Sequence, residues 1–312
     1  MLCLTKSEIA GLLQSAMRTN TIVQRLVLYS ELIRIPNGFT ATADSMAGYI
    51  LAAGMPYIRV LPMILVAIAS FCLYSAGAVL NDIRDLRKDQ MFFPHRPIAA
   101  KKISVQEAWI FFCALLFFGC GLCWLINPMV CAISLFLVGS ICMYDVAFKR
   151  IIVLSSFWMG VCRFLNMLLG MAIVWQPGDI GQYYYYPAGL FIYVMFLCLA
   201  VKLGERGRYR RSSALYILLF VVVYYAVGFA LKYFWYPAGY ACLLCLVLAV
   251  WVMYGAYITG NGPFSNVMKS LTLGIILFDA MLTGGQSGWT PAVIVLGCLV
   301  PSVVLSQFFR IT

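Results

Sequence analysis

The sequence predicts an all-α fold, a polytopic membrane helical bundle of nine or ten transmembrane helices. Of its 312 residues, 63% are hydrophobic and only 11% are charged, which is too apolar for an ordinary soluble domain. Apolar runs of about 20 residues recur along the chain, each long enough to cross a bilayer. The Lys and Arg residues fall in alternate connections between these runs, so that all but Arg59, Arg163 and Lys232 lie on one predicted side.

The positive-inside rule makes the side that carries these bases cytoplasmic. We therefore expect an integral protein of the plasma membrane, the inner membrane of a bacterium, with both termini in the cytoplasm. The net charge of +11 is explained by this orientation, so it does not indicate a nucleic-acid partner.

The chain divides into two predicted parts. Residues 1–33 mix apolar and polar positions, which is typical of an interfacial amphipathic helix. Residues 34–312 form the predicted transmembrane domain, whose first span opens at Arg34-Ile35-Pro36-Asn37. The later predicted spans cover approximately residues 57–80, 105–126, 129–147, a fifth that includes 160–170, then 187–203, 213–231, 238–258, 267–284 and 290–308.

A polar stretch, Asn81 to Asp89, follows the second predicted span. Carboxylates near lipid are costly, so they indicate a functional site. If the helix continues through the stretch, Asp82, Asp85 and Asp89 share one helix face and repel one another unless a cation lies between them. Oxygen ligands favour Mg²⁺, which completes its coordination with water and substrate phosphates.

This stretch and the residues that follow it resemble a motif of a known family. The pattern Asn81-Asp82-x-x-Asp85-x-x-x-Asp89, followed by His95-Arg96-Pro97-Ile98 and Ile103-Ser104, resembles the first aspartate-rich motif of UbiA-type intramembrane prenyltransferases. In that family the motif holds Mg²⁺ on the diphosphate of an isoprenyl donor. The resemblance implies Mg²⁺-dependent transfer of an isoprenyl group from an isoprenyl diphosphate to an unidentified acceptor in the membrane, hydrophobic or polar, with release of diphosphate.

Three other segments are similar to the same family. They are Arg34-x-Pro36-Asn37, the segment from Tyr144 to Lys149-Arg150, and Arg163-x-x-Asn166-x-x-x-Gly170. We favour a functional role for Lys149 and a topology-anchor role for Arg150. The predicted catalytic residues are Asn81, Asp82, Asp85, Asp89, Lys149, Arg163 and Asn166, with Asp82, Asp85 and Asp89 as metal ligands. The predicted substrate-binding residues are Arg34, Asn37, Asp44, His95, Arg96, Tyr144, Asp145, Lys202, Glu205, Arg206, Arg208 and Asp279.

Three of these residues are charges placed well within predicted spans, away from the span ends. Arg163 needs an anionic partner, for which Asp44, Asp145 or a bound diphosphate are candidates. Asp44 is compatible with a cavity role and with a structural hydrogen bond between helices. Asp279 is a further functional-site candidate or a partner for Arg163.

The segment after the sixth span departs from the family. Most members carry a second aspartate-rich motif there, whereas this chain has one acid, Glu205, among five bases from Lys202 to Arg211. Either fixed cations replace the second metal, which we favour, or the site has lost activity or accepts a different substrate. The degenerate motif, together with Asp279, is most similar to the EboC-like branch.

Other classes of protein are also compatible with parts of the sequence. A transporter or a non-catalytic lipid-binding protein on the same scaffold would explain Asp44, Arg163 and Asp279, although no inverted repeat is visible. A CDP-alcohol phosphotransferase would need an Asp-Gly-x-x-Ala-Arg signature, which is absent. The pairs Cys120-x-x-Cys123 and Cys242-x-x-Cys245 lie in apolar runs, which favours packing roles over zinc or disulfides.

Overall fold

The computed structural model describes residues 21–174, 184–205, 213–261 and 263–307, and all regular elements within these ranges are helices. The all-α membrane bundle predicted from the sequence is confirmed. In chain order the elements are α2 (Thr21–Leu32), α3 (Ile35–Ala53), the 3-10 turn η1 (Met55–Tyr57), α4 (Val60–Arg84), α5 (Leu86–Phe92), α6 (Val105–Ile126), α7 (Pro128–Met143), the π-helical turn η2 (Tyr144–Phe148), α8 (Ile152–Met171), α10 (Tyr185–Glu205), α11 (Ser213–Ala230), α12 (Pro237–Ile258), α13 (Phe264–Ser287), α14 (Trp289–Leu296) and α15 (Leu299–Ser306).

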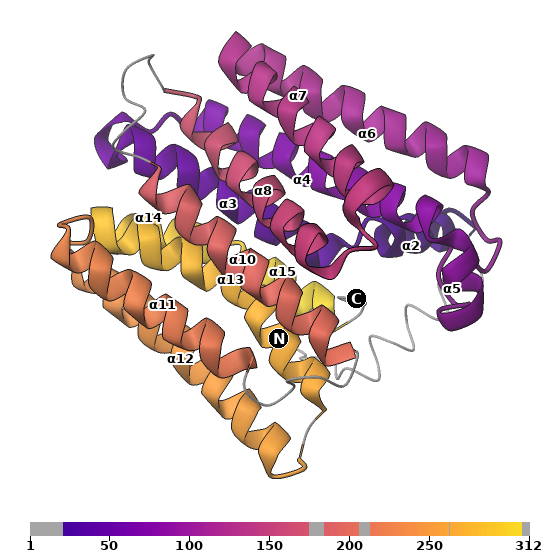
Figure 1. Cartoon of the computed structure of the whole chain (residues 1–312). Helices are drawn as coiled ribbons and strands as arrows, with labels where there is room; N and C mark the ends of the chain where they lie inside the picture. The colour runs from indigo at the N-terminus through magenta and orange to yellow at the C-terminus, as the bar shows by residue number, and fades with distance from the viewer. Residues whose placement is uncertain (1–20, 175–183, 206–212, 262, 308–312) are drawn as a thin grey trace, which may run out of the picture.

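The helices form one bundle with its N-terminal and C-terminal halves side by side. Figure 1 shows α6 and α7 along one side of the molecule and α11 and α12 along the opposite side. Between them, α8 packs on both α3 and α10, and α13 packs on α3 and α12. The ends of α4, α7 and α10 and the starts of α3 and α8 therefore meet at one end of the bundle.

Eight helices of the described chain are long and apolar enough to cross a membrane, judged by length and composition. They are Val60–Arg84, Val105–Ile126, Pro128–Phe148, Ile152–Met171, Tyr185–Leu203, Pro237–Ile258, Asn266–Ser287 and Trp289–Ser306. Polar residues keep α3 out of this set, and the apolar part of α11, Ala214–Ala230, is slightly too short. With these two helices, each predicted span has its counterpart, although the last one is interrupted at Gly297 between α14 and α15.

Capping chemistry explains where several helices begin. Ser104 and Glu107 form a reciprocal capping box at the start of α6. The Asn127 side chain accepts from the Val130 amide at 2.8 Å and is followed by Pro128, a favourable pair at the start of α7. Arg34 has a left-handed backbone, φ 52°, which separates α2 from α3.

The condition that one helix continues through the aspartate stretch is not met. α4 ends at Arg84, Asp85 has φ −89° and ψ 5°, and a separate helix, α5, begins at Leu86. This bridge conformation changes the direction of the chain while the amides of Asp85 and Asp89 still bond to carbonyls four residues back. Figure 1 shows α5 leaving the axis of α4.

Two further predictions concern the N-terminus and the cysteines. Residues 1–20 of the predicted interfacial helix lie outside the described residues; α2 covers part of the remainder and exposes Ile22 and Leu26. Its position at the interface stays a prediction. Eleven of the twelve cysteines lie in the described chain, and all eleven are free thiols.

Small residues let α3 and α8 approach closely. A Cβ added at Gly170 would collide with the Ser45 carbonyl, and one added at Gly48 would collide with the Met167 carbonyl. Close backbone contact through glycine is a common way to associate helices in membranes, where apolar burial contributes little.

We expect Gly170→Ala to lower the free energy of unfolding by about 2 kcal/mol, because the new methyl group meets rigid backbone. Gly121→Ala on α6 is the matched control, since a Cβ at Gly121 meets nothing within 4 Å. Equal thermal stability of the two purified variants in detergent would contradict this account of the α3–α8 contact.

Candidate active site

Two hollows meet at the end of the bundle where α4 ends and α8 begins. The inner cavity, about 120 Å³, lies between α3, α4, α7 and α8 and has Tyr74, Asn81, Arg163 and Asn166 among its lining residues. The outer hollow, about 730 Å³, is lined by the α4–α5 junction, η2 and the end of α10. Tyr144 and Asp145 line both hollows, so they form the wall between them.

This wall is built by the π-helical turn η2. The Lys149 amide bonds to the Tyr144 carbonyl, five residues back, at 3.0 Å. Such turns contain an extra residue and occur frequently at functional sites. Here the turn places Tyr144, Asp145 and Lys149 at the end of the bundle that holds the aspartate stretch.

One group of ion pairs joins the aspartate stretch to Arg34 and Arg96. Asp82 accepts from Arg34 Nη2 at 2.6 Å and lies 3.5 Å from Arg96 Nη1. Asp89 accepts from the same Arg96 nitrogen at 2.8 Å. Burial raises the pKa of the Asp89 carboxyl above its ordinary value, while Arg96 opposes the rise. One guanidinium nitrogen therefore lies between two buried carboxylates.

Lys149 gathers a second group of partners. Its Nζ lies 2.6 Å from Asp85 Oδ2, 2.6 Å from Asn81 Oδ1 and 3.5 Å from Asp145 Oδ1. Asp85 thus pairs with a different base, on a different element, from Asp82 and Asp89. Arg150 is exposed and has no carboxylate within ion-pair distance in the described chain, and its anchor role stays a prediction.

We call the end of the bundle where Asp82, Asp85 and Asp89 meet Arg34, Arg96 and Lys149 the mouth. The other residues predicted to lie near the mouth have different surroundings. Lys202 Nζ donates to Ser155 Oγ at 2.5 Å and lies over the Tyr144 ring at 5.4 Å from its centroid. Asn37 is buried in the first turn of α3, and His95 is exposed beside Phe93. Arg206 and Arg208 lie outside the described residues, as does the side chain of Glu205.

A buried polar cluster forms the inner end of the cavity. Arg163, on α8, donates to Asp44 Oδ2 at 2.7 Å and to Thr40 Oγ1 at 2.8 Å. Asn166 donates to the same Asp44 oxygen at 3.0 Å. Asp44 is fully buried, does not line the cavity, and bonds to two side chains that do.

Asp279, on α13, adds a second carboxyl to this cluster. It is fully buried near Asp44, and neither of its oxygens has a hydrogen-bond partner among the residues that the structure describes. With one guanidinium for two carboxyls, the cluster is neutral when one carboxyl carries a proton. Asp279 is the carboxyl that can stay neutral, since Asp44 already accepts from Arg163 and Asn166.

Sequence reasoning missed several polar residues around the cavity. Tyr74 lines it and receives the Arg163 guanidinium over its ring, at 5.5 Å from the centroid. Ser70 donates to Asn166 Oδ1 at 2.7 Å. The signal for Tyr74 was its spacing, because Tyr74, Ala78, Asn81 and Asp85 follow the helical repeat of one face. Ser70 carries no such signal.

The carboxylate oxygens of the aspartate stretch suit a hard cation, although the residues that the structure describes do not form a complete metal site. No three acidic, His or Cys side chains there lie close enough to hold an ion. Asp82, Asp85 and Asp89 nevertheless surround one mouth, and Asp89 Oδ1 is a buried acceptor without a hydrogen-bond partner. Mg²⁺ keeps waters and substrate oxygens in its shell, so two carboxylates suffice to anchor it.

The bundle and its charged mouth define an integral membrane protein with a polar site at the end of an apolar cavity. The family model described as "UbiA prenyltransferase family" matches residues 44–262. The chain therefore belongs to the UbiA prenyltransferase family.

Individual relatives agree with this assignment. A digeranylgeranylglyceryl phosphate synthase of Methanococcus vannielii is 35% identical over 94 residues, which are 30% of this chain and 34% of the relative. The chain thus covers about a third of the length of such curated relatives.

Solved structures show the same fold. The apo structure of a UbiA homologue from Aeropyrum pernix K1 gives a TM-score of 0.65 at 17% identity, covering 80% of this chain and 97% of that one. A structure described as digeranylgeranylglyceryl phosphate synthase in membranes gives 0.58 at 21% identity, covering 84% and 99%.

The buried cluster generates a prediction that compares two isosteric variants. We expect Asp44→Asn to lower the free energy of unfolding by about 3 kcal/mol, because it leaves Arg163 buried without its carboxylate. Asp279→Asn should change it by less than about 1 kcal/mol, because a neutral amide can replace a neutral carboxyl beside Asp44. Thermal unfolding of both variants tests this, and a larger loss in Asp279→Asn would contradict the assignment of charges.

Proposed function

We propose that the protein transfers an isoprenyl group from an isoprenyl diphosphate to an acceptor within the membrane, with Mg²⁺ as cofactor and diphosphate as the leaving group. The observation that carries the proposal is the mouth, where Asp82, Asp85 and Asp89 meet Arg34, Arg96 and Lys149 beside an apolar-walled cavity. Membership of the UbiA prenyltransferase family supports it.

Asp82 and Asp89 would hold the Mg²⁺ ion, with Asp85 on the side of the outer hollow. When bound, the ion would neutralise the negative charge that develops on the departing diphosphate. Arg96, which now lies between Asp82 and Asp89, would turn its guanidinium to phosphate oxygens once a cation takes its place.

The outer hollow is the site that suits the diphosphate. Among the residues that the structure describes, its lining has a surplus of bases over acids, with only Asp85 and Asp145 opposing them. The bases are Arg84, Arg87, Lys88, Lys149, Arg150 and Lys202. Fixed cations of this kind stabilise a phosphoryl leaving group without reorganising. This surplus supports the view that bases replace the second metal of the family.

The inner cavity would receive the reacting end of the isoprenyl chain. The bond between its first carbon and the diphosphate oxygen breaks, and the electron pair leaves with the diphosphate. A new bond forms from the acceptor's nucleophilic atom to that carbon, and the acceptor loses its proton. Tyr74 and Tyr144 line this cavity, and its apolar walls would keep water from the allylic carbon.

The acceptor is the open part of the proposal. The archaeal relatives are named for digeranylgeranylglyceryl phosphate, so a glyceryl phosphate is the first acceptor to test. Two rival functions remain: a non-catalytic protein that binds the donor without transferring it, and a transporter. Either could have the same charged mouth, but neither would release diphosphate.

We expect purified protein to bind an isoprenyl diphosphate only when Mg²⁺ is present, and chelation with EDTA to abolish this binding. Asp82→Asn and Asp89→Asn should each weaken binding by about tenfold or more, because each removes a charged oxygen ligand. Glu107→Gln is the control, since that carboxylate only caps α6 and pairs with Arg25. Binding that ignores Mg²⁺ would indicate a non-catalytic role, and no binding would favour transport.

Two single bases allow a second test. Lys149→Met should weaken diphosphate binding by about tenfold, because Lys149 lines the outer hollow and lies among Asn81, Asp85 and Asp145. Lys102→Met should weaken it by less than about twofold, because Lys102 lines neither hollow and is an exposed charge screened by solvent. Equal losses measured by calorimetry would mean that only general positive charge matters.

A further inference from the structure

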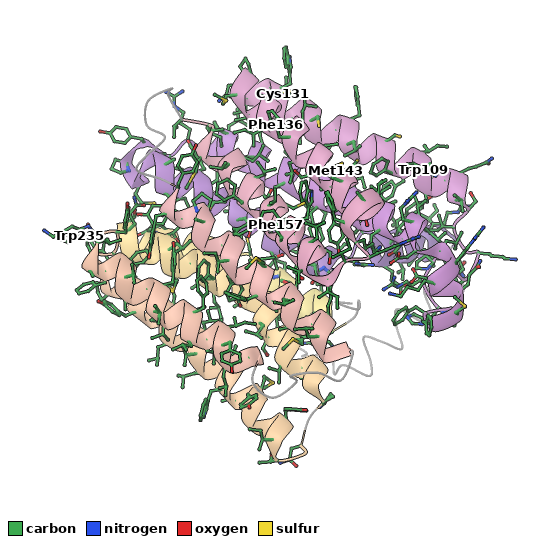
Figure 2. The ribbon with its side chains drawn as sticks, viewed as in Figure 1. Trp109, Cys131, Phe136, Met143, Phe157 and Trp235 are labelled. Atoms are coloured by element: carbon green, nitrogen blue, oxygen red, sulfur yellow. The ribbon has the colours of Figure 1, made fainter. Side chains whose placement is uncertain are left out.

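The last helix of the described chain, α15, turns a buried side toward α3. α15 packs on α3 and α13, and it lies beyond the residues 44–262 that the family model matches. Side chains at the edges of the bundle face outward, as Figure 2 shows for Trp109 and Trp235, which are both exposed. Cys298 and Ser302, one helical turn apart, are instead buried and contact residues of α3.

The Ser302 hydroxyl makes a bond that few serines of this bundle make. Serine hydroxyls in helices commonly donate to a carbonyl of their own helix. Ser306 does so to Val303 at 2.7 Å, and Ser155 does so to Ile152 at 2.9 Å. Ser302 is fully buried and donates to the Pro36 carbonyl of α3 at 2.6 Å. The bond therefore joins α15 to α3, across 266 positions of sequence.

The accepting carbonyl belongs to the first turn of α3, directly after Arg34. The Arg34 backbone is left-handed, with φ 52° and ψ 54°, which is a costly conformation for a residue with a Cβ. The Asn37 amide donates to the Arg34 carbonyl at 2.9 Å, so this turn and Arg34 are held together. A bond that fixes Pro36 therefore also limits the movement of Arg34.

Arg34 is one of the bases of the mouth. Its Nη2 donates to Asp82 at 2.6 Å, and its side chain is among those that line the inner cavity. Strained backbone conformations persist where the surrounding structure fixes them, and they cluster at functional sites. Here the ion pair with Asp82 fixes the Arg34 side chain, and the bond from Ser302 fixes the turn that follows it.

We propose that Ser302 is a positioning residue of the candidate active site. Through the Pro36 carbonyl it holds the first turn of α3, and so it keeps the Arg34 guanidinium at Asp82. The inference rests on the function proposed above, in which Asp82 binds the Mg²⁺ that meets the diphosphate. Ser302 lines neither of the two hollows, so it acts through Arg34 and not by touching the donor.

Donor binding tests whether Ser302 acts through Arg34. We expect Ser302→Ala to weaken Mg²⁺-dependent binding of a twenty-carbon isoprenyl diphosphate by about fivefold, because a looser turn places Arg34 less well. Ser306→Ala is the matched control, since that hydroxyl bonds within α15, and it should change binding by less than about twofold. In an Arg34→Met background, Ser302→Ala should weaken binding by less than about twofold further.

Three outcomes of this experiment would overturn the proposal. The first is wild-type affinity in Ser302→Ala, and the second is the same loss with and without Arg34, which would make the two residues independent. The third concerns Gln286, which donates to the Leu51 carbonyl near the other end of α3. If Gln286→Ala weakens binding as much as Ser302→Ala does, general loosening of α3 is the cause. Failure of the wild type to bind the donor would instead overturn the proposed function.

A second measurement needs no donor. Deuterium exchange of backbone amides, read by mass spectrometry, compares the first turn of α3, residues 37–40, with its far end, residues 47–53. Ser302→Ala should speed exchange in the first turn by about fivefold and leave the far end unchanged, because only the local opening becomes easier. Unchanged exchange in the first turn, or equal acceleration at both ends, would overturn the positioning role whether or not the protein binds an isoprenyl diphosphate.

Discussion

A charge inside a membrane bundle must find its counter-charge within the protein, and this requirement organises the structure. The ion pair between Arg163 and Asp44 joins α8 to α3 in a region where both side chains are buried away from bulk solvent. The same two helices approach closely through Gly48 and Gly170, so the polar and the steric contacts reinforce one another. Their fixed spacing gives the inner cavity its shape.

The same requirement explains the mouth. Three carboxylates gathered near lipid would repel one another, yet each lies against a base from another part of the chain. A metal diphosphate brings charges of both signs, so binding would exchange partners: the carboxylates would turn to the metal and the bases to the phosphates. The net change in buried charge would be small, which favours tight and reversible binding.

Sequence patterns predicted the parts of the protein that depend on composition and charge. Each apolar segment became a helix, and Arg163 and Asp44 could be paired because so few charges lie in the spans. The helix break at Asp85 could not be predicted, because no Gly or Pro marks it. Thr40 and Ser70 were also missed, because short polar side chains in membrane helices often bond to their own backbone.

The π-helical turn at the end of α7 has a consequence for how this site could have arisen. In a regular α-helix the amide facing the Tyr144 carbonyl would belong to Phe148, but here it belongs to Lys149. The π turn takes up one additional residue, so the helix on either side of it stays in register. A gain of a single codon in a plain apolar span would thus produce the bulge that forms the wall, with the lysine still opposite the Tyr144 carbonyl. Loss of that codon should keep the helix and remove the wall.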